Sequence, residues 1–449
     1  MKKTVILISA IIMAVMLFTA CGSDDDIQAE DTTTPAEAAD AQAPAGDDTA
    51  TAPAPVDRVP LSLEVSPPAR ATFATHENGS TFAITDDGTL WAWGYNSWGW
   101  LGDGTQSTRW EPVRVMDNVV CITATRGPGE PTIFAIDQNS TLWAWGSGGS
   151  IPSEDDRSNR FAPEIVMENV ANVFPSYLGA RIFVVDNDNV LWGWGSNRNQ
   201  ELEDSDVERI FTPIRFMDNV LAVDVSTMLI SVLTTNGEVW SGREIHSLEY
   251  VKSNVAYLCT NRTSDREANF ITQTGEFSRD FEDEIFVGVR SLASGKHSVT
   301  RATFVLTVDD QLYGFGSVDH WLGEAYAPQN RGRRPLHIMD SVDSIILSAP
   351  DCGGLAHPMF IDTNGILFIY GEGLNLAQPL AVMENVVTAF TSSPSDVRNA
   401  VDPERQSYFA ITRDGTLWAW GHAANGRLGN GTNEWTEHPV AILENMMMP

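Results

Sequence analysis

Thr81–Gly94 reads TFAITDDGTLWAWG, and similar stretches return along the chain. Close copies begin at Ile133 (IFAIDQNSTLWAWG), Ile182 (IFVVDNDNVLWGWG) and Tyr408 (YFAITRDGTLWAWG), and weaker copies occupy 230–242, 269–280, 303–316 and 359–371. In each copy, alternating apolar residues flank a turn rich in Asp, Asn and Gly, which predicts a β-hairpin. The repetition therefore predicts an all-β chain in which one small unit recurs.

A second phrase follows each hairpin, as in PVRVMDNV at 112–119 and PVAILENM at 439–446. Its proline cannot donate a backbone hydrogen bond, which favours an edge strand, and its Asn-Val pair is expected to open the inner strand of the next unit. Four short strands in roughly 48 residues are typical of one β-propeller blade.

Eight copies can be counted, which predicts eight four-stranded blades. Seven blades is the alternative, because the fourth and fifth copies are short. The last copy lacks an inner strand, and we expect residues 69–74 to supply it, so that the two ends of the chain close the ring and remove the sheet edges.

The segment after the hairpin resembles a known repeat. Residues 94–104 read GYNSWGWLGDG and residues 421–431 read GHAANGRLGNG, close to the pattern Trp-Gly-x-Asn-x-x-Gly-x-Leu-Gly-x-Gly. In this respect the chain resembles the regulator of chromosome condensation repeat family over roughly residues 70–449, and the resemblance implies a β-propeller. The family's founding member is a nuclear nucleotide-exchange factor, but an acidic chain with an export signal is not expected to share that activity or its chromatin contacts. A secreted bacterial member that inhibits β-lactamase through loop aromatics is a closer analogy in binding mode, although the target does not transfer.

The N-terminal region predicts export and lipid attachment. Lys2 and Lys3 precede an apolar run that ends at Ala20, as in a signal peptide, and Cys21 follows as in a bacterial lipobox. We expect cleavage after residue 20, lipidation of Cys21, and location at the bacterial cell membrane on its extracytoplasmic side. Residues 21–60 contain ten acids against one base (Arg58) and are expected to form a disordered tether, while residues 61–449 form the propeller.

Composition excludes several functions. The chain has 449 residues with 60 acids, 28 Lys and Arg, and a net charge of −32, so nucleic acid is not expected as a partner. None of the eight histidines pairs at metal-ligand spacing, and no nucleophile elbow or phosphate loop occurs. We therefore expect no cofactor, no metal and no enzymatic activity. The Asp-rich turns are interpreted as turn chemistry rather than as calcium sites.

Tryptophan gives the candidate binding site. Nine of the 14 tryptophans lie in the repeated second strand, where packing between blades is expected. The other five are expected in the connections after that strand and therefore on one side of the ring, where aromatic side chains suit a protein interface or sugar stacking. With one tyrosine they form the candidate ligand-binding set: Tyr95, Trp98, Trp100, Trp110, Trp321 and Trp435.

The sequence thus favours a lipid-anchored, monomeric binding module that recognises a protein through loops on one face. The alternative is a carbohydrate-binding propeller that uses the same tryptophans. A hydrolase with paired carboxylates is a third hypothesis, for which the sequence marks no pair. A structural capping role for Trp98 and Trp100 also stays open at this point.

Overall fold

A computed structural model describes residues 62–65, 68, 70–76, 78–125, 131–153, 158–176, 181–225, 229–260, 268–279, 286–297, 300–316, 335–346, 358–370, 379–392 and 406–448. Residues Arg58–Pro449 form one compact unit. Within the described residues nearly all regular structure is β-strand. Cys21, Trp321 and the predicted boundaries at residues 20 and 60 lie outside the described residues.

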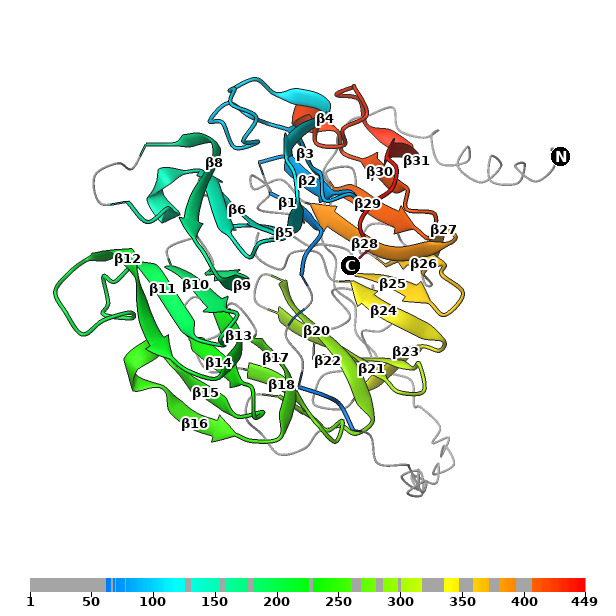
Figure 1. Cartoon of the computed structure of the whole chain (residues 1–449). Coiled ribbons are helices and arrows are strands. Elements are labelled where there is room, and N and C mark those ends of the chain that lie inside the picture. The colour runs from blue at the N-terminus through cyan, green and yellow to red at the C-terminus, as the bar shows by residue number, and fades with distance from the viewer. Residues whose placement is uncertain are drawn as a thin grey trace, which may run out of the picture. The chain divides into compact units, whose positions relative to one another are not determined.

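The strands form eight consecutive antiparallel sheets (Figure 1). Blades 1 to 4 contain β1 (Phe73–Thr75), β2 (Ser80–Ile84), β3 (Leu90–Gly94) and β4 (Arg109–Met116); β5 (Val119–Ala124), β6 (Thr132–Asp137), β7 (Leu142–Gly146) and β8 (Arg160–Met167); β9 (Val170–Pro175), β10 (Arg181–Asp186), β11 (Leu191–Ser196) and β12 (Arg209–Met217); β13 (Val220–Val225), β14 (Ile230–Thr234), β15 (Val239–Gly242) and β16 (Glu249–Lys252). Blades 5 to 8 contain β17 (Val255–Thr260), β18 (Ala268–Thr272) and β19 (Phe277–Arg279); β20 (Val289–His297), β21 (Thr300–Thr307), β22 (Leu312–Gly316) and β23 (Leu336–Met339); β24 (Val342–Ile346), β25 (Met359–Asp362), β26 (Leu367–Ile369) and β27 (Leu380–Met383); β28 (Val386–Ser392), β29 (Ser407–Thr412), β30 (Leu417–Gly421) and β31 (Thr436–Leu443). Short 3-10 helices η1 (Gly148–Ser150), η2 (Ile245–Ser247) and η5 (Ala424–Gly426) lie in the connections.

Eight blades confirm the count of eight repeats, and the seven-blade alternative is wrong. Seven of the sheets have four strands, and the fifth has three among its described residues. The proline-containing phrases form the fourth, outermost strands, as predicted. The Asn-Val pairs open the innermost strand of the following blade, also as predicted.

The two faces of the ring carry different strand connections. Because successive strands of a blade are antiparallel, the connections alternate between the two sides of the sheet. We call the side with the first-to-second and third-to-fourth strand connections the loop face. The other side, with the hairpin turns and the short links between blades, is the turn face.

The turn face repeats one hydrogen-bonding arrangement at every junction. Between blades 1 and 2, Gln138 N donates to Asn118 O (2.7 Å) and Val119 N donates to Gly88 O (2.9 Å). The corresponding pair of bonds occurs at all eight junctions, including Asp86 N to Asn445 O and Met446 N to Gly415 O where the ring closes. The turns need positive φ, which Asn118 (58°) and Gly88 (81°) provide at low cost.

Both ends of the chain build the inner strand of blade 1, as the sequence predicts. Phe73 of β1 pairs with Ala83, and Met446 from the C-terminal end forms a bridge with Thr85. Ile84 links the two pieces, because its N–H donates to Thr72 O (3.0 Å) and its carbonyl accepts from Met447 N (2.9 Å). The closure leaves no open junction in the ring.

The described residues among 62–71 form a strap across the inner side of the ring, which the sequence did not reveal. Leu63 N donates to Gln273 O in blade 5 (2.7 Å), and the Leu63 side chain packs in that blade's apolar cluster. Val65 packs against the blade 4 cluster, and Pro68 O accepts from Asn172 Nδ2 of blade 3 (3.4 Å). Ala71 O then accepts from Ile122 N of blade 2 (2.9 Å). In Figure 1 this blue segment runs from the side of β18 to β1.

Candidate functional site

The site begins with a rigid loop on blade 1. Asn96 is fully buried, and its Nδ2 donates to Asp103 Oδ1 (3.0 Å) and to the carbonyls of Thr105 (3.1 Å) and Ser107 (3.2 Å). Its Oδ1 accepts from Leu101 N (2.9 Å). One side chain therefore holds both limbs of the loop 95–108, which explains the asparagine of the repeated phrase.

Blade 3 builds the same loop without the glycines of the phrase. Asn197 is buried, and its Nδ2 donates to the carbonyls of Glu203 (2.9 Å) and Val207 (3.0 Å). Its Oδ1 accepts from Leu202 N (2.9 Å). The buried asparagine thus organises the loop even where the rest of the phrase is lost.

Each loop also fastens its blade to the next one. Trp145 Nε1 of blade 2 donates to Trp100 O of the blade 1 loop (2.9 Å), and Trp93 Nε1 of blade 1 donates to Arg427 O of blade 8 (2.9 Å). Gly102 lies so close to the Trp145 ring that an added Cβ would sit 2.6 Å from Nε1. The packing between blades expected of the strand tryptophans is thereby confirmed for these rings.

The first tryptophan of each strand has a different partner. Trp143 Nε1 donates to Asp137 Oδ2 (3.0 Å) and Trp192 Nε1 to Asp186 Oδ2 (2.8 Å), both within their own blade near the turn face. Asp186 Oδ1 also accepts from the backbone of its own hairpin turn. At Asp186 the carboxylate therefore serves the turn geometry, as predicted for the Asp-rich turns, whereas Asp310 pairs with Arg290 (2.9 Å).

Exposed aromatic side chains gather at the loop-face ends of blades 8, 1 and 2. Trp98 (48% exposed) lies in the β3–β4 connection, and Trp435 (51%) immediately precedes β31. Trp110 (41%) is the second residue of β4, which corrects the expectation that it lies in a connection. Its neighbour in the next repeat is Phe161 (38%) of β8, which sequence reasoning missed.

Neighbouring loops support these exposed rings from behind. An added Cβ on Gly426 of blade 8 would lie 3.0 Å from the Trp110 ring, and one on Gly99 of blade 1 would overlap Phe161. Backbone bonds fix the same contacts, since Gly431 N donates to Trp110 O (2.9 Å) and Gly104 N donates to Phe161 O (2.8 Å). Trp110 and Phe161 are thus equivalent positions, each with one ring face against a loop and part of its surface in solvent.

Trp100 and Tyr95 differ from these exposed residues. Trp100 is 3% exposed, and its ring lies 5.4 Å from that of Tyr95 and 6.3 Å from that of His76. Tyr95 is half-buried beside it. A buried ring cannot be offered to a partner in this arrangement, so the structure favours the capping role for Trp100 and leaves Trp98 as the exposed member of that pair.

Electrostatics stiffen the blade 1 loop. Asp103 Oδ2 accepts from Arg109 Nε (2.6 Å), and Asp103 Oδ1 accepts from Thr105 N (3.0 Å). Burial acts to raise the pKa of Asp103, but the hydrogen bonds from Arg109 and Thr105 outweigh it and hold the pKa below its usual value. The carboxylate is therefore charged at neutral pH and fixes the start of β4.

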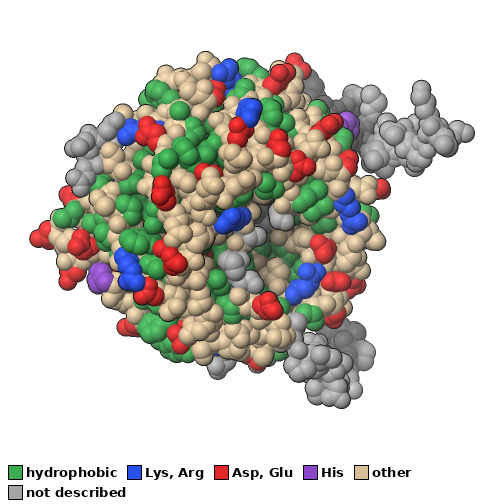
Figure 2. All heavy atoms as spheres, in the orientation of Figure 1, with side chains coloured by type: hydrophobic (Ala, Val, Ile, Leu, Met, Phe, Trp, Pro, Cys, Tyr) green, Lys and Arg blue, Asp and Glu red, His purple; other side chains and the backbone are tan. Residues whose placement is uncertain are grey.

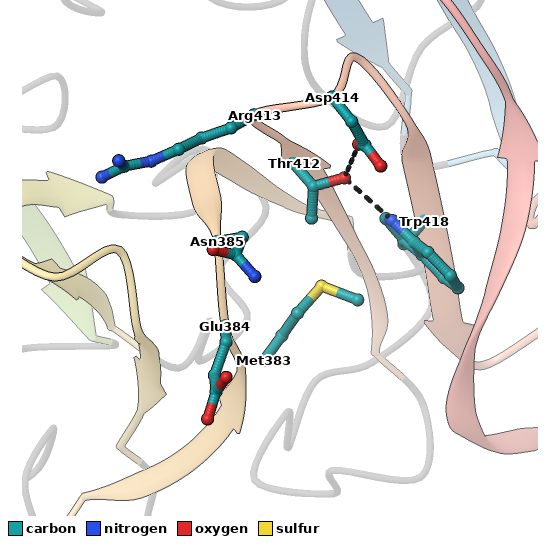
Figure 3. A pocket seen from close by; sticks show the side chains of 7 residues that line it. All are labelled: Met383, Glu384, Asn385, Thr412, Arg413, Asp414 and Trp418. Atoms are coloured by element: carbon teal, nitrogen blue, oxygen red, sulfur yellow. Dashed lines mark hydrogen bonds between the residues drawn. The ribbon is translucent and has the colours of Figure 1, made fainter. Parts of the chain in front are cut away.

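A separate pocket of about 430 Å³ lies on the turn face between blades 7 and 8. It is lined by Met383, Glu384, Asn385, Thr412, Arg413, Asp414 and Trp418. Figure 3 shows the Met383 side chain directed toward the Trp418 ring, with the Arg413 guanidinium extended away from both. Trp418 Nε1 already donates to Thr412 Oγ1 (3.1 Å) and that hydroxyl donates to Asp414 Oδ1 (2.6 Å). The corresponding methionine and tryptophan of blades 2 and 3, Met167 and Trp192, both pack against one apolar cluster, so the pocket lies at a position that recurs between blades.

The described residues contain no group of three or more His, Cys, Asp or Glu side chains placed to hold a metal ion. Within that same part of the chain, no helix is long and apolar enough to cross a membrane. Cys121 is a buried thiol whose pKa burial raises to about 11, so it stays protonated at neutral pH.

Comparisons with known proteins agree with this geometry. Residues 87–124, from the blade 1 hairpin turn to the inner strand of blade 2, match the model of the regulator of chromosome condensation (RCC1) repeat. The solved structure of yeast RCC1 (Prp20) bound to Kap60 has 15% identity and a TM-score of 0.50, and the match covers 88% of this chain and 91% of that one. The protein is an RCC1-like β-propeller.

One further solved structure is as distant in sequence as yeast RCC1, and the curated relatives match over a short stretch only. Human WBSCR16 shares the fold at 15% identity with a TM-score of 0.50, covering 79% of this chain and 94% of that chain. The human and mouse E3 ubiquitin-protein ligases HERC2 are 34% identical over 74 residues, which are 16% of this chain and 2% of each ligase. The chain therefore resembles those ligases over one short stretch and spans very little of their length.

Proposed function

We propose that this RCC1-like propeller is a lipid-anchored envelope protein that binds another protein through the aromatic side chains on the loop face of blades 8, 1 and 2. The observation that carries the proposal is a set of half-exposed rings, Trp98, Trp110, Phe161 and Trp435, of which Trp110 and Phe161 rest on glycines of neighbouring loops. Rigid aromatic side chains lose little conformational entropy on binding and are the commonest anchors of protein interfaces.

The surroundings of these rings favour protein over sugar. Phe161 and Ile165 (59% exposed) lie on the same outer strand, so exposed apolar surface continues beyond the rings, as in the apolar centre of a protein interface. The yeast RCC1 whose fold this chain shares was solved bound to Kap60, which gives one example of a protein of this fold in a complex with another protein. The chain has a net charge of −32, and acidic side chains are scattered over the side of the ring seen in Figure 2; both suit a neutral or basic partner.

The lipid anchor rests on the sequence. The apolar run ending at Ala20 and the cysteine that follows it support attachment through Cys21, with the propeller held outside the membrane by the acidic tether. Replacing Cys21 by Ser should move the protein from the membrane fraction to the soluble fraction. Retention of the variant in membranes would contradict lipid anchoring and would leave the binding proposal untouched.

The binding proposal is tested by capture from envelope extract with the full-length chain and a Trp98→Ala/Trp435→Ala variant. A matched control is Val308→Ala, which removes an exposed apolar side chain (44%) on the turn face. We expect one protein to be retained by the wild type and the control and lost, by tenfold or more, from the double variant. Equal retention by all three would contradict the site, and loss of retention on addition of free sugar would show a glycan ligand instead.

A further inference from the structure

The outer edge of blade 4 differs from the other described outer edges of the ring. In blade 1, Arg114 of the outer strand faces Trp91, the first aromatic residue of the third strand, and Pro112 lies two residues before Arg114. Six blades have a proline at this position: Pro112, Pro163, Pro213, Pro335, Pro379 and Pro439. In blade 4, Tyr250 of β16 faces Trp240, and Leu248 takes the position of the proline. The corresponding segment of blade 5 lies outside the described residues.

The missing proline matters because its position faces outward. In blade 1, Thr85 N donates to Thr89 O, which fixes the direction of the backbone groups along β3 because that direction alternates from residue to residue. The N–H and C=O of Trp91 therefore point toward β2, and those of Ala92 point toward β4. Val113, opposite Ala92, therefore bonds inward, and the neighbouring Pro112 has its backbone on the outer side. A proline there removes the N–H that another strand would need, which is a common protection of exposed sheet edges.

The same alternation applies to blade 4. Thr234 N donates to Glu238 O, so the backbone groups of Trp240 point toward β14 and those of Ser241 point toward β16. Glu249 lies opposite Ser241, and its N–H and C=O therefore point inward to β15. Leu248 and Tyr250 therefore direct their N–H and C=O groups outward. Neither residue has an outward backbone hydrogen bond to any other described residue.

The side chains around this edge are placed to receive a strand. Tyr250 is 53% exposed, and its ring stands edge-to-face on Trp240 at 5.7 Å. Glu249 is exposed and forms no ion pair with the described residues. At the other end of β16, Lys252 places its ammonium group 5.0 Å above the Phe270 ring.

We propose that the outer edge of blade 4 binds an extended segment of a partner protein, which adds to the sheet as a fifth, antiparallel strand. Backbone hydrogen bonds from Leu248 and Tyr250 would supply the pairing. Charge complementarity defines the occupant, because an antiparallel strand that reads Glu-x-x-Lys places its lysine opposite Glu249 and its glutamate opposite Lys252. Apolar residues between them would lie against Tyr250 and Val251. The surface is separate from the aromatic loop-face site.

The probe is a disulfide-closed hairpin peptide whose free edge carries Glu-Thr-Val-Lys, since a preformed strand avoids most of the ordering cost of a linear peptide. It is titrated against the full-length chain with fluorescence anisotropy. A second hairpin carries Lys-Thr-Val-Glu. We expect the first hairpin to bind one site per chain and the second to bind about tenfold more weakly, because two cross-strand pairs change from attractive to repulsive.

Leu248→Pro gives the decisive variant. Leu248 has φ −64°, which matches the φ that the proline ring fixes, so the variant installs the protection found in the other blades. We expect tenfold or greater loss of hairpin binding, together with a lower melting temperature because the packing of the Leu248 side chain on its apolar cluster is lost. The matched control is Pro163→Leu, which removes the proline from the equivalent edge of blade 2. There Glu164 is paired with Arg160 and Met167 takes the place of Lys252, so the stoichiometry should stay at one site.

Should Leu248→Pro fail to fold, Glu249→Lys decides, because each hairpin would then form one attractive and one repulsive pair, and the tenfold preference between them should disappear. Three results would overturn the proposal: no binding of either hairpin at millimolar concentration, equal binding to the wild type and Leu248→Pro, or concentration-dependent dimerisation that competes with the hairpin. The last would show that the edge receives a second copy of the chain.

Discussion

The two faces of the ring differ in how uniform their hydrogen bonds are from repeat to repeat. On the turn face, a pair of backbone hydrogen bonds returns at all eight junctions, including blades whose sequence has drifted. On the loop face, the cap over the next blade differs from repeat to repeat: blade 1 uses Trp100 O, blade 8 uses Arg427 O and blade 2 uses Ser150 O. Backbone geometry requires the turns, whereas many loop sequences can supply one carbonyl. The loop face is therefore where side chains are free to differ.

The two tryptophans of one strand give the strongest test of this contrast. Trp145→Ala removes a fully buried ring that joins the blade 1 loop to blade 2 and should cost about 3–5 kcal/mol in the free energy of unfolding. Trp143→Ala removes a half-buried ring bonded to its own hairpin and should cost only about 1–2 kcal/mol. Chemical denaturation of both variants checks the ranking, and equal losses would contradict the assigned roles.

The next largest effect is expected at the centre of the loop. Asn96→Ala leaves the carbonyls of Thr105 and Ser107 and the N–H of Leu101 without their partner, at a cost of about 2–3 kcal/mol. Hydrogen exchange should show the loss confined to the loop 95–108. The control Ser97→Ala alters an exposed neighbour and should change stability by less than about 0.5 kcal/mol. If exchange quickened around the whole ring, the loop would not be a local unit.

A smaller effect is expected on the turn face. Asn118→Ala places a residue that disfavours positive φ at 58°, and should cost about 1 kcal/mol. Asn118→Gly should be close to neutral, because glycine adopts this conformation freely. Thermal unfolding of the pair measures the difference, and similar melting temperatures would contradict the role assigned to positive φ at this turn.

The smallest effect concerns acid. Since the folded state holds the pKa of Asp103 below its usual value near 3.8, its contribution to stability is present above that pH and is lost as the pH falls through the lower, folded-state pKa. Wild type should therefore lose more stability between pH 5 and 2 than Asp103→Asn, to a modest extent. Parallel acid titrations followed by tryptophan fluorescence compare the two proteins. Identical curves would contradict a contribution of the Asp103 carboxylate to stability.

Much of the fold could be predicted because it depends on local chemistry. The alternation around Asp87-Gly88 gives the hairpin, and the proline phrases give the outer strands. The site was predictable only in part. Trp98 and Trp435 are exposed as expected, but Trp100 is buried under its own loop, and nothing in its sequence neighbourhood separates it from Trp98. Phe161 could have been found by aligning it with Trp110 in the preceding repeat.

The sequence by itself favoured eight blades over seven and predicted the order of strands in each blade and the closure of the ring by both ends, because each follows from a period, a turn or a proline. Only the tertiary structure decided which tryptophans are exposed, that the described residues among 62–71 cross the ring, and that the position where blade 4 lacks its proline faces outward. Those features depend on which segments meet across hundreds of residues and on which side of a strand the backbone groups point. Neither property is carried by the order of residues along one repeat.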